Sequence, residues 1–281
     1  MLDRPERLRD YPHALNARGG FMKVVILCGG FGTRIRDVAD DIPKPMIPIG
    51  NLPIVWHIMK SYSAAGHKDF VLCLGYKSHA VKQFFLNYDI HGGDFTIALG
   101  AEKQITHHGE VRHDDWSVTL AETGLNAMTG ARIRRIRKYL GDDENFLLTY
   151  GDGVSDVDLD ALLEFHKSHG KILTVTGVHP PGRFGEIEHA NGQVQGFNEK
   201  SQTTSGMISG GYFVCRREIF DYLDDREDLV FEVGPVRALV AAGEMMVYEH
   251  HGFWQCMDTY RDWSLLRDLW DSGKAPWKSW E

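Results

Sequence analysis

The sequence lacks long hydrophobic runs, paired cysteines and an excess of positive charge. No stretch of 18 or more apolar residues occurs in its 281 residues, so we expect no membrane span. The four cysteines form no CxxC pair and no zinc-binding spacing, which favours reduced thiols in a cytoplasmic protein. The net charge is −8, so we expect no nucleic-acid partner, and a local basic cluster must hold any anionic ligand.

Residues 1–21 lack the apolar segment of a secretory signal peptide. They are rich in charged residues and have no repeating apolar pattern. Because such a composition buries too little apolar surface to fold, we expect a disordered leader ahead of a folded region that begins at Met22. An arm exchanged between the subunits of an oligomer is the alternative.

From Lys23 onward, segments of strand type alternate with segments of helix type. The segments that predict strands are 23–28, 69–76, 95–99, 116–120, 144–153, 171–178, 207–215 and 244–250, and those that predict helices are 53–66, 78–88, 158–170, 231–243 and 259–273. The pair Asn191-Gly192 predicts a β-hairpin. This alternation is typical of an α/β fold with a doubly wound, mostly parallel sheet. We expect one Rossmann-like domain over residues 22–281, with a more antiparallel C-terminal part.

A glycine-rich segment, CGGFGTRIRDVADDIPKPMIPIG over residues 28–50, directly follows the first strand. Ligands of open α/β sheets bind at the carboxyl ends of the strands, and glycines there let main-chain N–H groups approach an anion. Arg34 and Lys44 would add positive charge, and the two prolines beside Lys44 stiffen its turn. The spacing matches neither the Walker A motif nor the GxGxxG motif, so we predict a phosphate-binding loop of another type. The alternative is a turn that only connects two elements, with Arg34 and Lys44 as ordinary surface charges.

Asp152 follows an apolar strand and lies between two glycines in the segment YGDG. A carboxylate at that edge of the sheet suits Mg²⁺, which prefers one or two carboxylates together with phosphate oxygens. We therefore predict that Asp152 is a metal ligand. The alternative is a turn residue that bonds to its own main chain.

The segment GGFGTR, followed after an interval by PKPMIPIG, resembles the motif of the sugar-1-phosphate nucleotidyltransferases. The segments MTGARIRRI, TYGDGVSDVD, PPGRFGEI, GFWQCMDT and GKAPWKSWE resemble one branch of that family, the bacterial glucose-1-phosphate cytidylyltransferases. The similarity extends from Met22 to Glu281. It implies that a homo-oligomeric, Mg²⁺-dependent enzyme converts CTP and a sugar 1-phosphate into a CDP-sugar and pyrophosphate.

The resemblance also implies a division of the chain and a set of site residues. A nucleotide-binding half would cover about residues 22–155, and a sugar-binding half about 156–281. The nucleotide would contact Leu27, Cys28, Gly29, Gly30, Phe31, Gly32, Thr33, Arg34, Lys44, Arg132, Gly151 and Asp152, with Arg34 and Lys44 as catalytic residues. The long segment before Arg132 is shorter in thymidylyl- and uridylyltransferases, so it bears on the choice of base.

Asp258, in QCMDT, is the second metal ligand that the resemblance names. Its alternative role is the N-cap of a helix that starts near Thr259. The sugar phosphate would contact Gly185, Glu199, Lys200 and Gly211, although Glu199 and Lys200 could also form a plain surface ion pair.

Three positions depart from the family pattern. Ser201 and Cys256 replace usual prolines, and Ser209 replaces a usual asparagine. Ser201 and Ser209 fall in the region implied for the sugar, so a different sugar phosphate is an alternative substrate. A nucleotide-binding regulatory relative without turnover is the alternative function.

Overall fold

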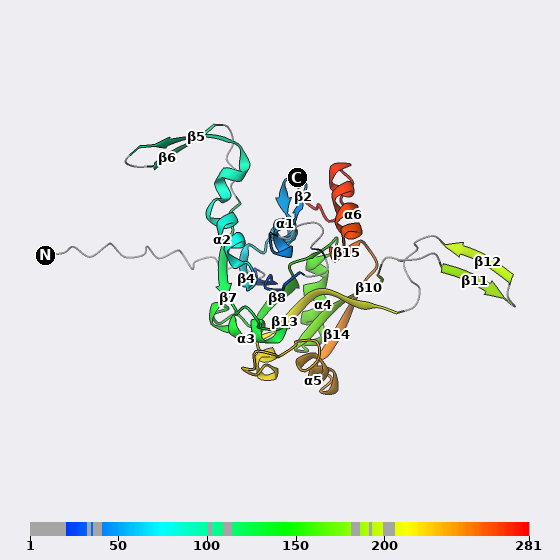
Figure 1. The fold of residues 1–281 in the computed structure, drawn as a ribbon. Coiled ribbons are helices and arrows are strands. Elements are labelled where there is room, and N and C mark those ends of the chain that lie inside the picture. Colours follow the sequence, from blue (N-terminus) through cyan, green and yellow to red (C-terminus); the bar gives the residue numbers. More distant parts are fainter. Residues whose placement is uncertain are drawn as a thin grey trace.

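The structure, a computed structural model, describes residues 21–32, 35, 41–100, 103–108, 114–180, 186–190, 193–198 and 206–280. Its centre is a seven-stranded sheet with the order β14-β10-β13-β8-β1-β4-β7 (Figure 1). The strands are β1 (Lys23–Leu27), β4 (Asp69–Leu74), β7 (Ser117–Glu122), β8 (Asn145–Tyr150), β10 (Leu173–Val178), β13 (Ile208–Arg216) and β14 (Met245–His250).

The sheet is parallel except around one strand. β1 pairs in parallel with β4 and β8, β4 with β7, and β10 with β14. β13 alone runs antiparallel to both of its neighbours in this sheet, β8 and β10. The predicted α/β fold with a mostly parallel sheet is therefore confirmed, and the antiparallel character of the C-terminal part comes from β13.

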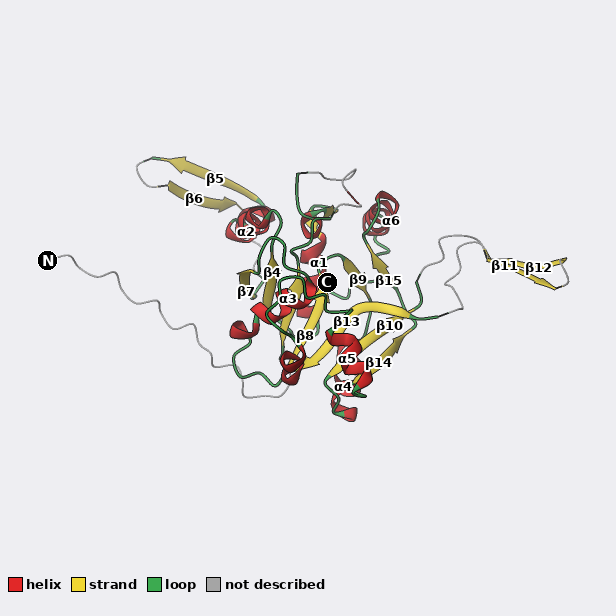
Figure 2. Ribbon diagram, turned by 60° about the horizontal axis from the view of Figure 1, so that its bottom comes forward, coloured by secondary structure: helices red, strands yellow, loops and turns green. Residues whose placement is uncertain are grey.

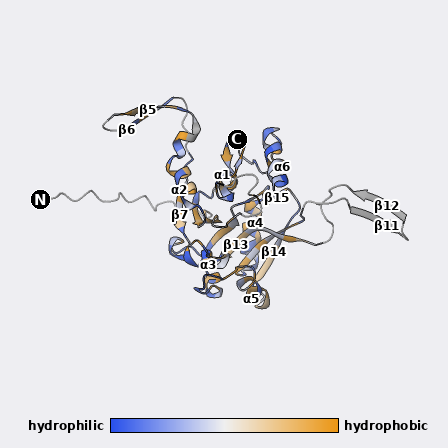
Figure 3. Ribbon diagram, viewed as in Figure 1, coloured by the Kyte–Doolittle hydropathy of each residue, from blue (hydrophilic) through white to orange (hydrophobic). Residues whose placement is uncertain are grey.

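Helices cover both faces of the sheet (Figure 2). They are α1 (Ile54–Ala64), α2 (Ser78–Leu86), α3 (Thr129–Arg135), α4 (Leu159–His169), α5 (Pro235–Ala241) and α6 (Tyr260–Asp271). The side chains of β1 alternate between two hydrophobic cores: Val24 and Ile26 pack with α1 and α4, whereas Val25 and Leu27 pack with α3 and α5. Figure 3 shows hydrophobic residues along the central strands and hydrophilic residues on much of α6.

Short antiparallel pairs extend from this body. They are β2 (Pro48–Ile49) with β3 (Leu52–Pro53), β5 (Asp94–Leu99) with β6 (Lys103–His108), β9 (Gly153–Ser155) with β15 (Trp254–Cys256), and β11 (Glu186–Ala190) with β12 (Gln193–Asn198). β11 and β12 form the hairpin that Asn191-Gly192 predicted, although these two turn residues lie outside the described part of the chain.

Two expectations differ from the structure or stay open. The helix expected over 231–243 is shorter, because Pro235 begins α5 and residues 231–234 form a turn. The predicted leader falls on residues outside the described part of the chain, and the division into two halves stays a prediction. Among the described residues, none of the helices has the length and apolar content that a membrane crossing requires.

Candidate active site

A cavity of about 370 Å³ lies at the carboxyl ends of β1 and β8. The strand order reverses at β1, because β4 and β7 extend to one side and β8 to the other. Such a reversal is where open α/β sheets bind their ligands. The cavity is lined by Leu27, Cys28, Gly29, Gly30, Phe31, Gly32, Ile35, Lys44, Pro45, Asn126, Ala127, Met128, Thr129, Arg132, Tyr150, Gly151, Asp152 and Asp258.

The loop after β1 offers main-chain donors to this cavity. Gly151 N donates to Leu27 O at 3.0 Å and Cys28 N to Cys73 O at 3.0 Å. These two bonds fix the end of β1 to the segment after β8 on one side and to β4 on the other. Within the described part of the chain, the N–H groups of Gly29, Gly30 and Gly32 donate no hydrogen bond to the protein. Gly29 is buried and Gly32 half-buried, and buried N–H groups normally have a partner, whereas the exposed Gly30 can donate to water. The loop therefore has main-chain donors available for an anion.

Gly32 brings the loop close to Lys44. Its φ of 60° lies in the left-handed region, which favours glycine. A Cβ at Gly32 would lie 3.2 Å from the Cβ of Lys44, so a side chain there would crowd the lysine. Lys44 itself begins the short 3₁₀ helix η2 (Lys44–Met46), and Pro43 and Pro45 flank the lysine on both sides. The glycine and the two prolines therefore place the ammonium beside the loop.

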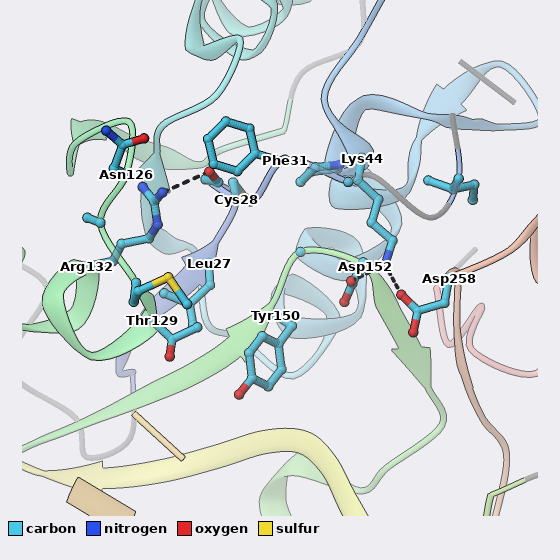
Figure 4. A pocket seen from close by; sticks show the side chains of 18 residues that line it. Leu27, Cys28, Phe31, Lys44, Asn126, Thr129, Arg132, Tyr150, Asp152 and Asp258 are labelled. Atoms are coloured by element: carbon cyan, nitrogen blue, oxygen red, sulfur yellow. Dashed lines mark hydrogen bonds and ion pairs between the residues drawn. The ribbon is translucent and has the colours of Figure 1, made fainter. Parts of the chain in front are cut away.

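The Lys44 ammonium lies between two carboxylates. Its Nζ is 2.5 Å from Asp152 Oδ2 and 2.5 Å from Asp258 Oδ1, and its side chain is 12% exposed. Figure 4 shows the lysine pointing toward both aspartates. Burial disfavours the charged ammonium, but the two carboxylates outweigh burial, and the pKa of Lys44 lies above its ordinary value. Lys44 is therefore a permanent cation at neutral pH.

Two local structures bring Asp258 to Asp152. β15 pairs with β9 so that Cys256 faces Gly153, and Met257 N donates to Asp152 O at 2.8 Å. Helix α6 is capped by Thr259, whose hydroxyl accepts from Asp262 N, while the Asp262 carboxylate accepts from Thr259 N. The alternative role of Asp258 as the N-cap is wrong, because Thr259 occupies that position.

The two aspartates fit a magnesium ion. Their oxygens converge on one ammonium, and a pair of carboxylates beside a phosphate-binding loop is a donor set that Mg²⁺ prefers. In the described ranges, no group of three or more His, Cys, Asp or Glu side chains gathers at one point. A magnesium ion held here would therefore take its other ligands from phosphate oxygens and water.

Arg132 lines the cavity but is only 4% exposed. Its Nη1 donates to Leu74 O at 2.9 Å, Thr123 Oγ1 at 2.8 Å and Gly124 O at 2.9 Å. Its Nη2 donates to Gly29 O at 2.9 Å and Leu125 O at 3.3 Å. Burial lowers the pKa of the guanidinium, which nevertheless stays charged at any physiological pH. The nucleotide contact implied for Arg132 stays a prediction, and the contacts seen here are all to the protein.

Several residues that line or support the cavity were not singled out from the sequence. Tyr150 ends β8 and hydrogen-bonds through its hydroxyl to Glu232, which also accepts from Thr129 Oγ1 at 2.9 Å. Burial and the neighbouring Glu232 raise the pKa of Tyr150, so the phenol stays protonated. Thr129 lies in the segment MTGAR and Tyr150 precedes GDG, so both were close to recognised motifs. No local signal in the sequence points to Glu232.

The predicted residues divide into three groups. The cavity brings together Leu27, Cys28, Gly29, Gly30, Phe31, Gly32, Lys44, Arg132, Gly151, Asp152 and Asp258. Gly211 does not line the cavity; it lies behind Tyr150, whose ring would be 2.6 Å from a Cβ at this glycine. Outside the described part of the chain lie Thr33, Arg34, Gly185, Glu199 and Lys200. The assigned roles of all these residues stay predictions.

This fold and this cavity define a nucleotidyltransferase. Residues 23–259 match the nucleotidyl transferase family, and the chain belongs to it. It is 48% identical over 260 residues to the glucose-1-phosphate cytidylyltransferase of Salmonella typhimurium, an alignment that covers 92% of this chain and 100% of that protein. It is 41% identical to the probable glucose-1-phosphate cytidylyltransferase of Bacillus subtilis, with the same coverage. The resemblance that the motifs indicated is therefore confirmed.

Solved structures agree on the fold. The crystal structure of HddC from Yersinia pseudotuberculosis complexed with GMP-PN superimposes with a TM-score of 0.63 at 20% identity, covering 89% of this chain and 100% of that one. UDP-glucose pyrophosphorylase complexed with UDP-glucose gives a TM-score of 0.64 at 14% identity, covering 90% of this chain and 100% of that one.

Proposed function

We propose that this protein transfers CMP from CTP to α-D-glucose 1-phosphate. A phosphate oxygen of the sugar phosphate attacks the α-phosphorus of CTP and forms a new P–O bond. The bond between the α-phosphorus and the oxygen that bridges to the β-phosphate breaks, and pyrophosphate leaves with that electron pair. The products are CDP-glucose and pyrophosphate.

The chemistry requires positioning and charge neutralisation more than a protein nucleophile, because a phosphate monoester is already nucleophilic at neutral pH. The N–H groups of Gly29, Gly30 and Gly32, which donate to no other described residue, are suited to the triphosphate. Lys44 supplies a fixed cation at the same place. Residues 126–129, at the other end of the cavity, then face the base and the ribose.

We infer that Asp152 and Asp258 hold Mg²⁺ when the triphosphate is bound. The ion, when bound, would neutralise the negative charge that grows on the phosphate oxygens during the displacement. Both carboxylates face the Lys44 ammonium, which keeps their oxygens directed toward the cavity.

The single observation that carries the proposal is the cavity in which a glycine-rich loop, a largely buried lysine and two convergent aspartates meet. The test is release of pyrophosphate with CTP, UTP, dTTP, ATP and GTP, each against a panel of sugar 1-phosphates. We expect the highest kcat/KM with CTP and glucose 1-phosphate. If another sugar phosphate is preferred, the Ser201 and Ser209 departures have changed the substrate. If no pair gives turnover but CTP binds, the protein is the regulatory relative.

We also infer a cytoplasmic homo-oligomer. The four cysteines are free, as is usual in a reducing compartment. The hairpin β5–β6 exposes Phe95, Ile97, Leu99 and Ile105, and a two-stranded hairpin alone is marginally stable in water, which supports contact with a second copy of the chain. Light scattering should give more than one chain per particle, and a monomer at micromolar concentration would contradict this inference.

A further inference from the structure

The Arg132 side chain hydrogen-bonds to main-chain oxygens of the two loops that line opposite ends of the cavity. Its guanidinium reaches the phosphate-binding loop at Gly29 O and the base-facing loop, residues 124–129, at Gly124 O and Leu125 O. It also reaches Leu74 O at the end of β4 and Thr123 Oγ1 after β7. One side chain of α3 therefore joins two strand ends and two loops.

The contacts of this guanidinium are unusual in their chemistry. In the described ranges it forms no ion pair, and its hydrogen-bond acceptors are four main-chain oxygens and one hydroxyl. A buried cation without a carboxylate is costly, and a site that binds a polyanion offsets part of that cost. Arg132 lines the cavity although its Nη donors are directed to the protein.

Two glycines lie so close to the same guanidinium that neither position has room for a side chain. A Cβ at Gly29 would lie 2.1 Å from Arg132 Nη1, and a Cβ at Gly75 would lie 2.5 Å from the same atom. Neither glycine has a positive φ, so the requirement for glycine comes from close approach to the arginine. Gly29 O accepts a second hydrogen bond, from Tyr76 N at 3.3 Å, which holds the carbonyl in place.

From this geometry we propose that Arg132 is a positioning residue, which holds the phosphate-binding loop and the base-facing loop in one fixed arrangement. It acts on the nucleotide through these loops and not by touching the phosphates. The consequence is that base binding and phosphate binding depend on the same side chain. This inference rests on the proposed function, since the ligand that spans both loops is CTP.

The test uses the two halves of the ligand separately. Binding of cytidine, of inorganic tripolyphosphate and of CTP is measured by calorimetry on the full chain and on Arg132→Met and Arg132→Lys. Arg134→Met is the matched control, because Arg134 lies on the same helix, pairs with Asp225 at the surface and does not line the cavity. Thermal unfolding of every variant checks that the fold is kept.

We expect Arg132→Met to weaken cytidine and tripolyphosphate alike, each by about 10-fold or more, because a hydrogen bond from a charged group is lost at both loops. Arg132→Lys should not fully restore the binding of either cytidine or tripolyphosphate, because an ammonium cannot reach the five acceptors that the planar guanidinium reaches. Gly29→Ala, which displaces the guanidinium, should weaken cytidine although Gly29 lies in the other loop.

Three outcomes separate the alternatives. If Arg132→Met weakens tripolyphosphate alone and Arg132→Lys restores it, Arg132 contacts the phosphates directly and the inference is overturned. If Arg132→Met weakens cytidine alone, Arg132 contacts the base, and the inference is again overturned. If the unaltered protein binds no CTP, the proposed function fails and the inference fails with it.

Discussion

Asp152→Asn is the substitution that most directly probes the chemistry of the cavity. It keeps the shape of the side chain and removes one of the two carboxylates that face Lys44 Nζ, at 2.5 Å each. Because we propose that Asp152 is a ligand of the magnesium ion, we expect the substitution to lower kcat. The affinity for CTP should be kept, since a negative charge beside the triphosphate is removed.

The size of the effect follows from the contact that is lost. A hydrogen bond to a charged group contributes ~1.5–3 kcal/mol, and ~1.4 kcal/mol corresponds to a tenfold change in rate. One lost carboxylate contact therefore predicts a kcat lower by roughly 10- to 150-fold. The Asp152 side chain is 30% exposed, so the lower part of this range applies if water screens the site.

The assay is steady-state release of pyrophosphate at saturating Mg²⁺, with CTP and glucose 1-phosphate varied one at a time. Asp156→Asn is the matched control, because Asp156 is on the same segment but pairs with His250 Nε2 at 2.9 Å, away from the cavity. A near-normal kcat for Asp152→Asn, or an equal loss for Asp156→Asn, would refute the assignment of Asp152.

Three further predictions concern stability, base choice and the leader. His166 is 2% exposed, and burial with the nearby His169 and Arg216 lowers its pKa to about 4, below the ~6.5 of the unfolded chain. Between pH 7 and pH 4.5 the unfolded chain protonates this histidine and the folded chain does not, so the free energy of unfolding should fall by about 2–3 kcal/mol. Urea unfolding of His166→Asn should show a smaller fall over the same pH range, and an equal fall would contradict this prediction. The kcat/KM for CTP should exceed that for UTP by up to ~10⁴, because the amino donor of cytosine and the carbonyl acceptor of uracil need opposite partners in a buried site. Similar values of kcat/KM for both nucleotides would count against this prediction. A chain that starts at Met22 should keep its activity and its number of chains per particle, because Met22 N still reaches His67 Nδ1, at 3.2 Å. A large loss of activity or a change in the number of chains would show a role for the leader.

The local features of the site could be predicted from the sequence. Gly29, Gly30 and Gly32 follow an apolar strand directly, and Asp152 follows another, so strand pattern and the rule for open α/β sheets sufficed to place them at one edge. The alternation of strand and helix gave the mostly parallel sheet for the same reason. The sequence did not show that β13 is the antiparallel strand, because the residues of a single strand carry no local mark of its direction.

Contacts between distant segments could not be predicted from residue patterns alone, although the family resemblance named Asp258 as a site residue. Lys44 and Asp258 are 214 residues apart and meet only because β15 pairs with β9. Arg132 looks like Arg134 and Arg135 in the segment ARIRR, and only the packing of α3 against the strand ends shows that it is buried. Glu232 reaches Tyr150 and Thr129 from a turn that shares no motif with either.

The central claim, transfer of CMP to an intact sugar phosphate, is tested most directly by following oxygen atoms. The protein is incubated with Mg²⁺, CTP and glucose 1-phosphate whose phosphate carries ¹⁸O, and both products are analysed by mass spectrometry. We predict equal amounts of CDP-glucose and pyrophosphate, with the label retained in CDP-glucose and absent from pyrophosphate, because the sugar phosphate attacks the α-phosphorus of CTP. Label in pyrophosphate, or hydrolysis of CTP to CMP without CDP-glucose, would contradict the account.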